Sequence, residues 1–256
     1  MVELNQSRRS GGHIRVPVVC EVNREDRAGE FGCPVEEVAL VLVDTWNGGD
    51  PKEGEAPRSH LLSTQMLLNR CRENGVTIIH APNHPVVDRY PQYREISEEV
   101  RAFVEGQSSS DGTPPHLSWP PLDNDVLASA LEIRKTGQGS QSKRDISRLL
   151  TPLESEYVLA SHDEFRYVLW KRGVKLLLYA GGALNECMQH RDTGINLLIG
   201  SDGPRTGFTV VVLEDCSTAT TSPRLNSQEM AIAMLEYFKR KIAFVGRSDE
   251  ITFDHE

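Results

Sequence analysis

The chain has 256 residues, a formal net charge of −9, 38% hydrophobic residues and 25% charged residues. This length and composition suit one large globular domain and exclude a chain that is disordered throughout. The negative charge leaves no broad basic face, so we expect no nucleic-acid partner. No stretch approaches the roughly 18 apolar residues that a membrane span needs, so we expect no membrane contact.

Five cysteines are scattered along the sequence without a Cys-x-x-Cys pair. Their odd number and wide spacing argue against a disulfide scaffold and against a zinc knuckle. The first residues also lack the apolar core of a signal peptide. We therefore expect a reduced, cytoplasmic protein.

Strand and helix signals alternate along the chain, which is typical of a mostly parallel sheet between two layers of helices. The run VALVLVD, from Val38 to Asp44, is almost continuously apolar, as expected for a central strand that is covered on both faces. The sequence thus predicts an α/β fold, a three-layer αβα sandwich with a six-stranded, mostly parallel sheet. The strands are expected at 38–44, 76–82, 157–161, 174–180, 207–215 and 242–246.

The main domain is predicted over 38–246, with residues 247–256 as a C-terminal tail. Residues 1–37 are expected to form an N-terminal extension, in which IRVPVVCEV adds an edge strand or a subunit contact. Residues 106–152 are rich in Gly, Pro and Ser and predict an irregular insertion. Such an insertion serves either as a lid or partner contact or as padding.

Helices are predicted between the strands from the spacing of apolar residues. In the first helix, over 59–74, Leu62, Met66 and Leu67 form an apolar stripe, and Gly75 ends the helix. The other helices are expected at 95–104, 163–172, 185–199 and 227–240.

Cys187 is the most informative residue, because the strand run KLLLYAGG leads to it through a turn of four residues. This position predicts a thiol in the first turn of a helix. Unpaired N–H groups and the positive end of the helix dipole lower the pKa of a thiol there, as a nucleophile requires. The alternative is a small buried apolar cysteine without a chemical role.

Asp44 ends the first strand of the predicted domain. In open α/β sheets, ligands bind at the carboxyl ends of the strands, so we expect Asp44 and Cys187 to point into one crevice. An acid at a strand end also serves often as a cap or a loop hydrogen-bond acceptor.

The segments VALVLVDTWN, TIIHAP, RGVKLLLYAGGALNECM and VVVLEDCST resemble the isochorismatase-like cysteine hydrolases, which include nicotinamidases, N-carbamoylsarcosine amidase and ureidoacrylate hydrolase. The resemblance extends from about Val38 to Gly246. Its most specific part is GGALNEC, which is similar to the family's Gly-x-x-Thr-x-x-Cys nucleophile turn with Leu184 in place of Thr.

The resemblance implies that Cys187 attacks a carbonyl carbon and that Asp44 takes the thiol proton. It also implies a cis peptide before Ala183, which directs the N–H groups of Ala183 and Cys187 toward an oxyanion. By the same resemblance we expect a small-molecule amide-like substrate and a homo-oligomer, either a dimer or a tetramer.

The sequence departs from the family where a lysine is expected, because no Lys occurs between Arg144 and Trp170. His162 is our candidate for part of the missing role, since a protonated imidazole favours a thiolate. A solvent-facing or capping histidine is the alternative. Lys135 and Lys143 from the insertion are weaker candidates.

Some relatives bind a metal through an Asp-x-His motif after the second strand. In HAPNHP the place of the aspartate is held by Pro82, which leaves His80 and His84 without a carboxylate partner. Two histidines four residues apart on a loop are a weak metal signal. We therefore expect no catalytic metal and no cofactor.

Trp46, Tyr90, Asn47 and Asn185 are predicted to contact the substrate, with packing and capping as the alternatives. The predicted function is a cysteine-dependent hydrolase that cleaves a C–N bond of a small amide or ureide through a thioester. The alternative is a catalytically inactive binding protein that kept the fold and lost the lysine.

Overall fold

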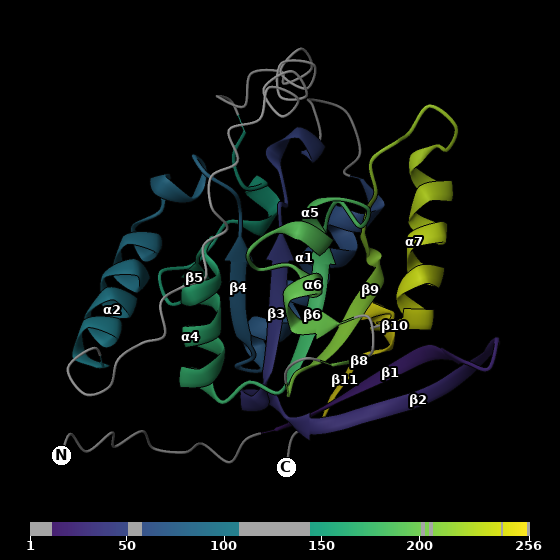
Figure 1. Cartoon of the computed structure of the whole chain (residues 1–256), viewed down its shortest axis with the longest axis horizontal. Coiled ribbons are helices and arrows are strands. Elements are labelled where there is room, and N and C mark those ends of the chain that lie inside the picture. The colour runs from purple at the N-terminus through teal and green to yellow at the C-terminus, as the bar shows by residue number, and fades with distance from the viewer. Residues whose placement is uncertain are drawn as a thin grey trace, which may run out of the picture.

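The computed structural model describes residues 12–50, 58–107, 144–200, 203–204, 207–241 and 243–254. Within these residues one sheet of nine strands forms the centre, in the order β11-β1-β10-β9-β6-β3-β4-β5, and β2 pairs with β1 (Figure 1). The strands from β10 to β5 all run parallel. These are β3 (Val38–Val43), β4 (Thr77–Ala81), β5 (Tyr157–Val158), β6 (Leu176–Gly181), β9 (Thr209–Ser217) and β10 (Phe244–Gly246).

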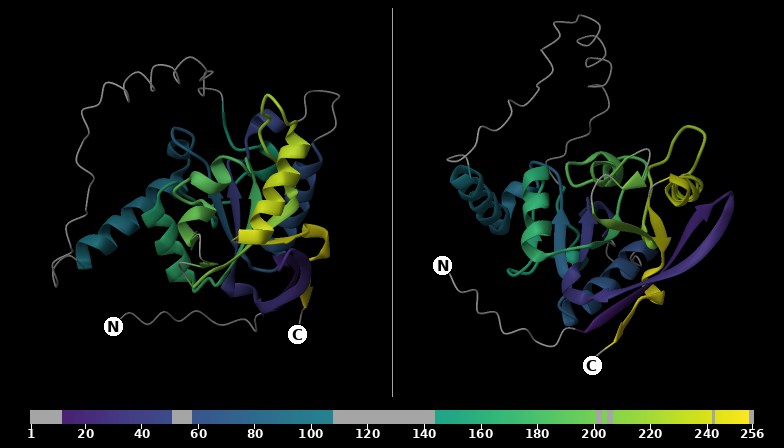
Figure 2. Two further views of the ribbon diagram at one scale, coloured as in Figure 1. Left: turned by 45° about the vertical axis from the view of Figure 1, so that its right-hand side comes forward. Right: turned by 60° about the horizontal axis from the view of Figure 1, so that its bottom comes forward.

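The parallel strands are the six that the sequence predicts, but the prediction of a six-stranded sheet is wrong. Three antiparallel strands extend it: β1 (His13–Val22), β2 (Glu25–Pro34) and β11 (Thr252–Asp254). β1 is not an edge strand, because it pairs with β10, β11 and β2. Figure 2 shows the β1–β2 hairpin extending from one end of the sheet.

The β1–β2 hairpin explains why the apolar pattern of the sequence predicts too few strands. Most of β2, EDRAGEFGCP, is exposed on both faces, so it lacks the apolar alternation that indicates a strand. Its pairing with β1 runs from His13 opposite Pro34 to Val22 opposite Glu25. Main-chain hydrogen bonds along its whole length hold β2 in the sheet, and only its last residues, among them Phe31 and Cys33, also pack against the core.

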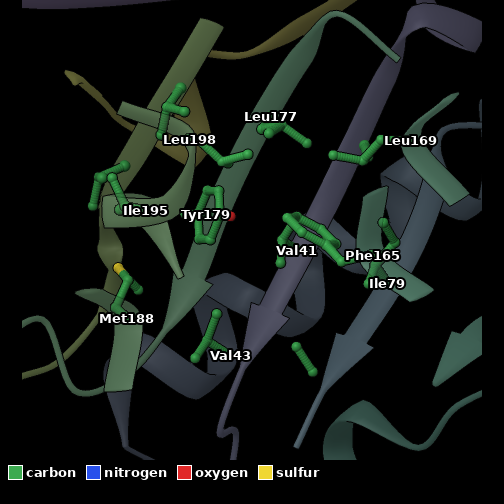
Figure 3. Packing of buried hydrophobic residues seen from close by; sticks show 14 of the residues in the cluster. Val41, Val43, Ile79, Phe165, Leu169, Leu177, Tyr179, Met188, Ile195 and Leu198 are labelled. Carbon is green, nitrogen blue, oxygen red and sulfur yellow. The ribbon is translucent and has the colours of Figure 1, made fainter. Parts of the chain in front are cut away.

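Helices cover both faces of the parallel strands, as the predicted sandwich requires. In β3, Val41 and Val43 face a cluster that includes Phe165 of α4, whereas Leu40 and Leu42 face the cluster around α1. Figure 3 shows the first cluster, in which side chains of α4, α5 and α6 surround Val41 and Tyr179. Because both faces of β3 are buried, every position in it is apolar.

Among the described residues, α1 (Ser59–Glu73) covers one face and five helices cover the other. The five are α2 (Pro91–Gln107), α4 (His162–Arg172), α5 (Cys187–His190), α6 (Ile195–Leu198) and α7 (Ser227–Lys241). Short 3-10 helices are η1 (Val35–Glu37), η2 (Asn47–Gly49), η3 (Val87–Arg89), η5 (Arg148–Leu150) and η6 (Ser248–Glu250), and β7 (Ile199–Gly200) pairs with β8 (Gly203–Pro204). None of the described helices is long and apolar enough to cross a membrane.

The position of α1 confirms the first predicted helix, but its predicted apolar stripe is wrong. Leu62 and Met66 are exposed, and of the three stripe residues only Leu67 is buried. The buried face instead contains Thr64, whose hydroxyl donates to the carbonyl of His60 at 2.6 Å. This bond satisfies a polar group inside the core, so a polar residue occupies a position that apolar spacing alone does not assign to the core. The complete buried face is Leu61, Thr64, Leu67, Leu68 and Cys71.

The predicted helix over 185–199 is divided into α5 and α6 by a turn. The turn follows from Asp192, Thr193 and Gly194, which are poor helix formers. Gly194 donates its N–H to the carbonyl of Arg191 at 2.7 Å, and a β-carbon on Gly194 would lie 2.8 Å from that oxygen. Met188, Ile195 and Leu198 are nevertheless buried, as predicted.

One buried carboxylate holds α1, β4 and the segment before β5 together. Glu156 accepts bonds from Nε of Arg72 at 2.6 Å, from Nε2 of His80 at 2.9 Å and from the N–H of Leu153 at 2.9 Å. Burial alone raises the pKa of Glu156, but the bonds from His80, Arg72 and Leu153 outweigh it and hold the pKa at about 2. Burial also lowers the pKa of His80, so the ring is a neutral donor.

We expect Glu156→Gln to lower the free energy of unfolding by about 3 kcal/mol at neutral pH, because it breaks a buried ion pair. The folded pKa of Glu156 lies below its ordinary value of 4.5, so its contribution is complete above that value and is lost as the pH falls toward about 2. Urea denaturation as a function of pH measures this difference. Glu154→Gln, at an exposed position nearby, is the control; an equal effect of both variants, or one that does not decrease in acid, would contradict the assignment.

Candidate active site

The site lies where two neighbouring parallel strands end. β3 and β6 pair in register, with Val43 opposite Gly181, so the residues that follow them meet at one edge of the sheet. Gly181 has φ +109, and a β-carbon there would collide with the carbonyl oxygen of Val43. A glycine is therefore required for the close approach that brings Asp44 and the Cys187 turn together.

The main chain at both strand ends has an unusual conformation. Asp44 has φ +45, in the left-handed region, which Asp tolerates better than most residues. The Gly182–Ala183 peptide is cis, as the family resemblance implies. Cys187 follows as the first residue of α5, so its predicted place at a helix start is confirmed.

Two N–H groups in this turn, those of Ala183 and Cys187, have no main-chain partner among the described residues. The N–H of Ala183 lowers the pKa of the Cys187 thiol, against the larger effect of burial, which raises it. Both donors are therefore available to a ligand atom placed near the sulfur.

Arg191 joins Asp44 and Cys187 into one cluster, and sequence reasoning missed it. Its Nε and Nη2 donate to Oδ2 of Asp44 at 3.1 and 2.8 Å, and Nη2 lies 3.8 Å from Sγ of Cys187. The carboxyl side chain is almost fully buried, with 1% of its surface exposed. The guanidinium therefore compensates a charge that is costly to bury alone.

The turn between α5 and α6 is what places Arg191 there. Arg191 is the first residue after α5, with extended backbone angles that direct it away from the helix. The hydroxyl of Tyr179, inside β6, donates to the carbonyl of Thr193 at 2.7 Å and ties the turn to the sheet. Gly194 was the sequence signal that could have revealed this turn. The prediction of one continuous helix over 185–199 overlooked it.

The structure contradicts the predicted direction of the Cys187 pKa. Burial is the largest cause of the change, followed by the charge of Asp44, and together they raise the pKa of the thiol to about 11. Arg191 and the N–H of Ala183 act in the opposite direction but do not compensate. Since α5 has only four residues, its dipole is too short to lower the pKa as predicted.

Asp44 has one occupied and one available carboxylate oxygen. Burial raises the pKa of Asp44, and hydrogen bonding to the thiol of Cys187 and the charge of Arg191 oppose this change. Oδ2 accepts both bonds from Arg191, whereas buried Oδ1 accepts none from a nitrogen or oxygen donor in the described residues. Oδ1 is thus the oxygen that is free to exchange a proton with the thiol.

The structure does not bring His162 to this cluster. His162 is the first residue of α4, after the capping residue Ser161, and follows β5, which β4 separates from β3. No hydrogen bond or ion pair in the described residues joins it to Asp44 or Cys187, and its Nδ1 is buried without a partner. The cation beside the thiol is therefore Arg191. Lys135 and Lys143 lie outside the described residues.

A cavity of about 430 Å³ borders Asp44. Of the predicted substrate-binding residues, Trp46 and Asn47 line it, but Tyr90 and Asn185 do not. The Tyr90 hydroxyl instead donates to Asp145 at 2.7 Å, and Asn185 bonds with Thr220 at 2.8 Å. The lining residues are Asp44, Thr45, Trp46, Asn47, Gly48, Arg58, His60, Leu61, Thr64, Arg144, Gly181, Gly182 and Thr218.

The two histidines that were considered for a metal have separate partners. His80 bonds to Glu156 at 2.9 Å, and His84 lies 3.2 Å from Asp88. Among the residues that the structure describes, no group of three or more His, Cys, Asp and Glu side chains converges as a metal site would require.

Solved structures are similar to this chain in fold. A cysteine hydrolase from Pseudomonas syringae pv. phaseolicola is 15% identical with a TM-score of 0.52, over 85% of this chain and 92% of that chain. An N-carbamoylsarcosine amidase from Thermoplasma acidophilum is 16% identical with a TM-score of 0.44, over 84% and 98% of the two chains. An isochorismatase from Pseudomonas putida is 14% identical with a TM-score of 0.43, over 85% and 91%.

The similarity to the cysteine hydrolase confirms the family resemblance at the level of the fold. The other two scores are too low to support an argument of their own. No family model matches the sequence, and no curated protein does so. The similarity thus establishes the fold, and the chemistry has to be argued from the residues themselves.

We expect the rate of Cys187 alkylation by iodoacetamide to increase with pH, with a midpoint at about 11. Asp44→Asn should lower this midpoint, because it removes a negative charge that raises the thiol pKa, and Arg191→Gln should raise it. Mass spectrometry of the labelled peptide measures the rate as a function of pH.

Cys33 on β2 is a matched control, because burial followed by the charge of Glu37 raises its pKa to about 11 as well. Its labelling rate should not change in either variant. An unchanged Cys187 midpoint in Asp44→Asn would show that the two side chains are not coupled.

Proposed function

We propose that this protein is a cysteine-dependent hydrolase that cleaves the C–N bond of a small amide or ureide through a thioester intermediate. The observation that carries the proposal is the convergence of Cys187, Asp44 and Arg191 beside two available N–H donors. The shared fold with a cysteine hydrolase supports it. The cavity that Asp44 lines is large enough for a small substrate.

In the first step the Cys187 sulfur bonds to the carbonyl carbon of the substrate while Oδ1 of Asp44 takes the thiol proton. The electron pair of the carbonyl moves to oxygen, which becomes an oxyanion. The N–H groups of Ala183 and Cys187 stabilise it, and each such donor contributes about 3 kcal/mol in the transition state.

In the second step the oxyanion returns its electron pair to the carbon, and the C–N bond breaks. Protonated Asp44 gives its proton to the departing nitrogen, so an amine or ammonia leaves and a thioester remains. Water then attacks the thioester, with Asp44 as the base that takes its proton. Cleavage of the C–S bond releases the acid and returns the proton to the thiol.

The raised pKa values of both groups fit this sequence of steps. Asp44 with a raised pKa is a stronger base than an ordinary carboxylate, and a thiol that stays protonated until substrate arrives has a proton to transfer. Arg191 keeps the carboxylate ionised and oriented, and it supplies a cation beside the thiol and the aspartate, where the resemblance implies a lysine. Because Arg191 bonds only to Oδ2, it leaves Oδ1 free for the proton.

The inactive binding protein is the second candidate, and the same thiol pKa favours it. A thiol with a pKa of about 11 is almost entirely protonated at neutral pH and reacts slowly with ordinary electrophiles. The two candidates differ in whether a bound amide is turned over, because only a substrate that places its carbonyl beside the N–H donors uses the Asp44 base.

We expect Cys187→Ala to abolish ammonia release from a panel of primary amides and ureides, measured with a coupled glutamate dehydrogenase assay. Asp44→Asn should lower kcat by at least about 100-fold, since it removes the general base. Cys33→Ala, which removes a thiol of similar pKa on β2, should keep full activity. Undiminished turnover in Cys187→Ala would end the proposal.

We expect Arg191→Gln to shift the acid limb of the rate profile to higher pH. The guanidinium lowers the pKa of Asp44, so its loss raises that pKa, and the carboxylate then becomes protonated at a higher pH as the solution is acidified. Arg191→Lys keeps a positive charge and should shift the limb less. A limb at the same pH in wild type and Arg191→Gln would show that Arg191 acts only on the fold.

A further inference from the structure

The cavity beside Asp44 contains more positive charge than its own carboxylate balances. Arg58, His60 and Arg144 line it together with Asp44. The charge of Asp44 is already paired with Arg191, which is not one of the lining residues. Arg58 and Arg144 therefore line the cavity together with a single carboxylate, Asp44, whose charge is already paired with Arg191.

Arg144 is held at the cavity by its main chain. Nη1 of Arg89 donates to the carbonyl of Arg144 at 2.6 Å, and the next residue, Asp145, exchanges two bonds with Asn47, at 2.8 and 3.1 Å. Its guanidinium lies 5.8 Å from the centre of the Trp46 ring. The charge of Arg144 is also one of the influences that lower the pKa of Asp44, so it acts on the catalytic carboxylate from the cavity side.

Arg58, at the start of α1, also lines the cavity. It precedes α1, and its carbonyl accepts the N–H groups of Leu61 and Leu62, which fixes it at the helix start. Burial and then the charge of Arg58 lower the pKa of His60, so the Arg58 charge acts inside the cavity. The positive end of the 15-residue helix α1 adds to the same potential.

Both guanidinium groups are available to a ligand. Arg58 and Arg144 are exposed, and within the described ranges neither side chain has an ion pair or a hydrogen bond. Arginine binds carboxylates through two parallel N–H bonds, and Trp46 offers a flat apolar surface beside Arg144. The cavity thus combines two anion-binding groups, an aromatic wall and, at its edge, the carboxylate of the reaction centre.

We propose that Arg58 and Arg144 bind the carboxylate of an anionic substrate, so that the protein acts on amides or ureides that carry a carboxylate and discriminates against their neutral analogues. The reaction itself rests on the function proposed above. The recognition of the anion does not, because it depends only on the cavity and its two arginines. Volume limits the ligand to a small molecule, since the cavity measures about 430 Å³.

The test compares two thiol reagents that differ in charge, iodoacetate and iodoacetamide. Mass spectrometry gives the ratio of their rates at Cys187 in the full-length protein. We expect this ratio to fall about tenfold from wild type to the double variant Arg58→Gln and Arg144→Gln, because charged hydrogen bonds to the anion are lost. The double variant with Lys at both positions should keep an intermediate ratio, since it keeps the charge.

Arg101→Gln on the exposed side of α2 is the matched control and should leave the ratio unchanged. A second readout is ammonia release from succinamate and succinamide, which differ only in a carboxylate. We expect wild type to prefer succinamate and the Gln double variant to lose the preference through a higher KM for succinamate.

The possible outcomes test the anion site separately from the proposed hydrolase activity. An equal reagent ratio in wild type and the Gln double variant overturns the anion site, whatever is hydrolysed. A ratio that falls as expected in a protein that releases no ammonia from any amide supports the anion site and overturns the hydrolase. An equal fall in the Arg101→Gln control would show a general effect of net charge and would also overturn the site.

Discussion

The ion pair between Arg191 and Asp44 is the interaction on which the site depends. A carboxylate with 1% of its side-chain surface exposed is costly unless a cation compensates it, and Arg191 does so with two N–H bonds to one oxygen. The pair requires α5 to end at His190 and the chain to turn back toward the sheet. The close contact at Gly194 and the bond from Tyr179 to Thr193 hold that turn. The turn between α5 and α6 therefore positions Arg191 beside Asp44.

This ion pair also affects where the proton of the Cys187 thiol resides. Oδ2 is occupied by Arg191, Oδ1 is buried without a hydrogen-bond partner in the described residues, and burial together with the Asp44 charge keeps the thiol protonated. The proposed catalyst is therefore a neutral thiol beside a strong carboxylate base, in contrast to a preformed thiolate at a helix start. A low dielectric around the cluster strengthens each of these couplings.

The proposed chemistry and the proposed recognition depend on different kinds of structure. Asp44 and the Cys187 turn extend from strands β3 and β6, which are buried on both faces and fix their geometry. Arg58 and Arg144 lie on exposed segments at the mouth of the cavity, where substitution costs little stability. Such a division lets a shared fold keep one reaction centre while its loops select the substrate.

The sequence alone determined the six parallel strands, because strands buried on both faces have continuous apolar runs. It also predicted α4, which ends at Gly173, and it placed Asp44 at a strand end and Cys187 in the turn that follows another strand. Only the tertiary structure decided the β1–β2 hairpin, the partner of Asp44 and the direction of the thiol pKa. Arg191 and Asp44 are 147 residues apart, so no local pattern links them. Burial is likewise a property of the packed chain, and it outweighs the local effect of a helix start.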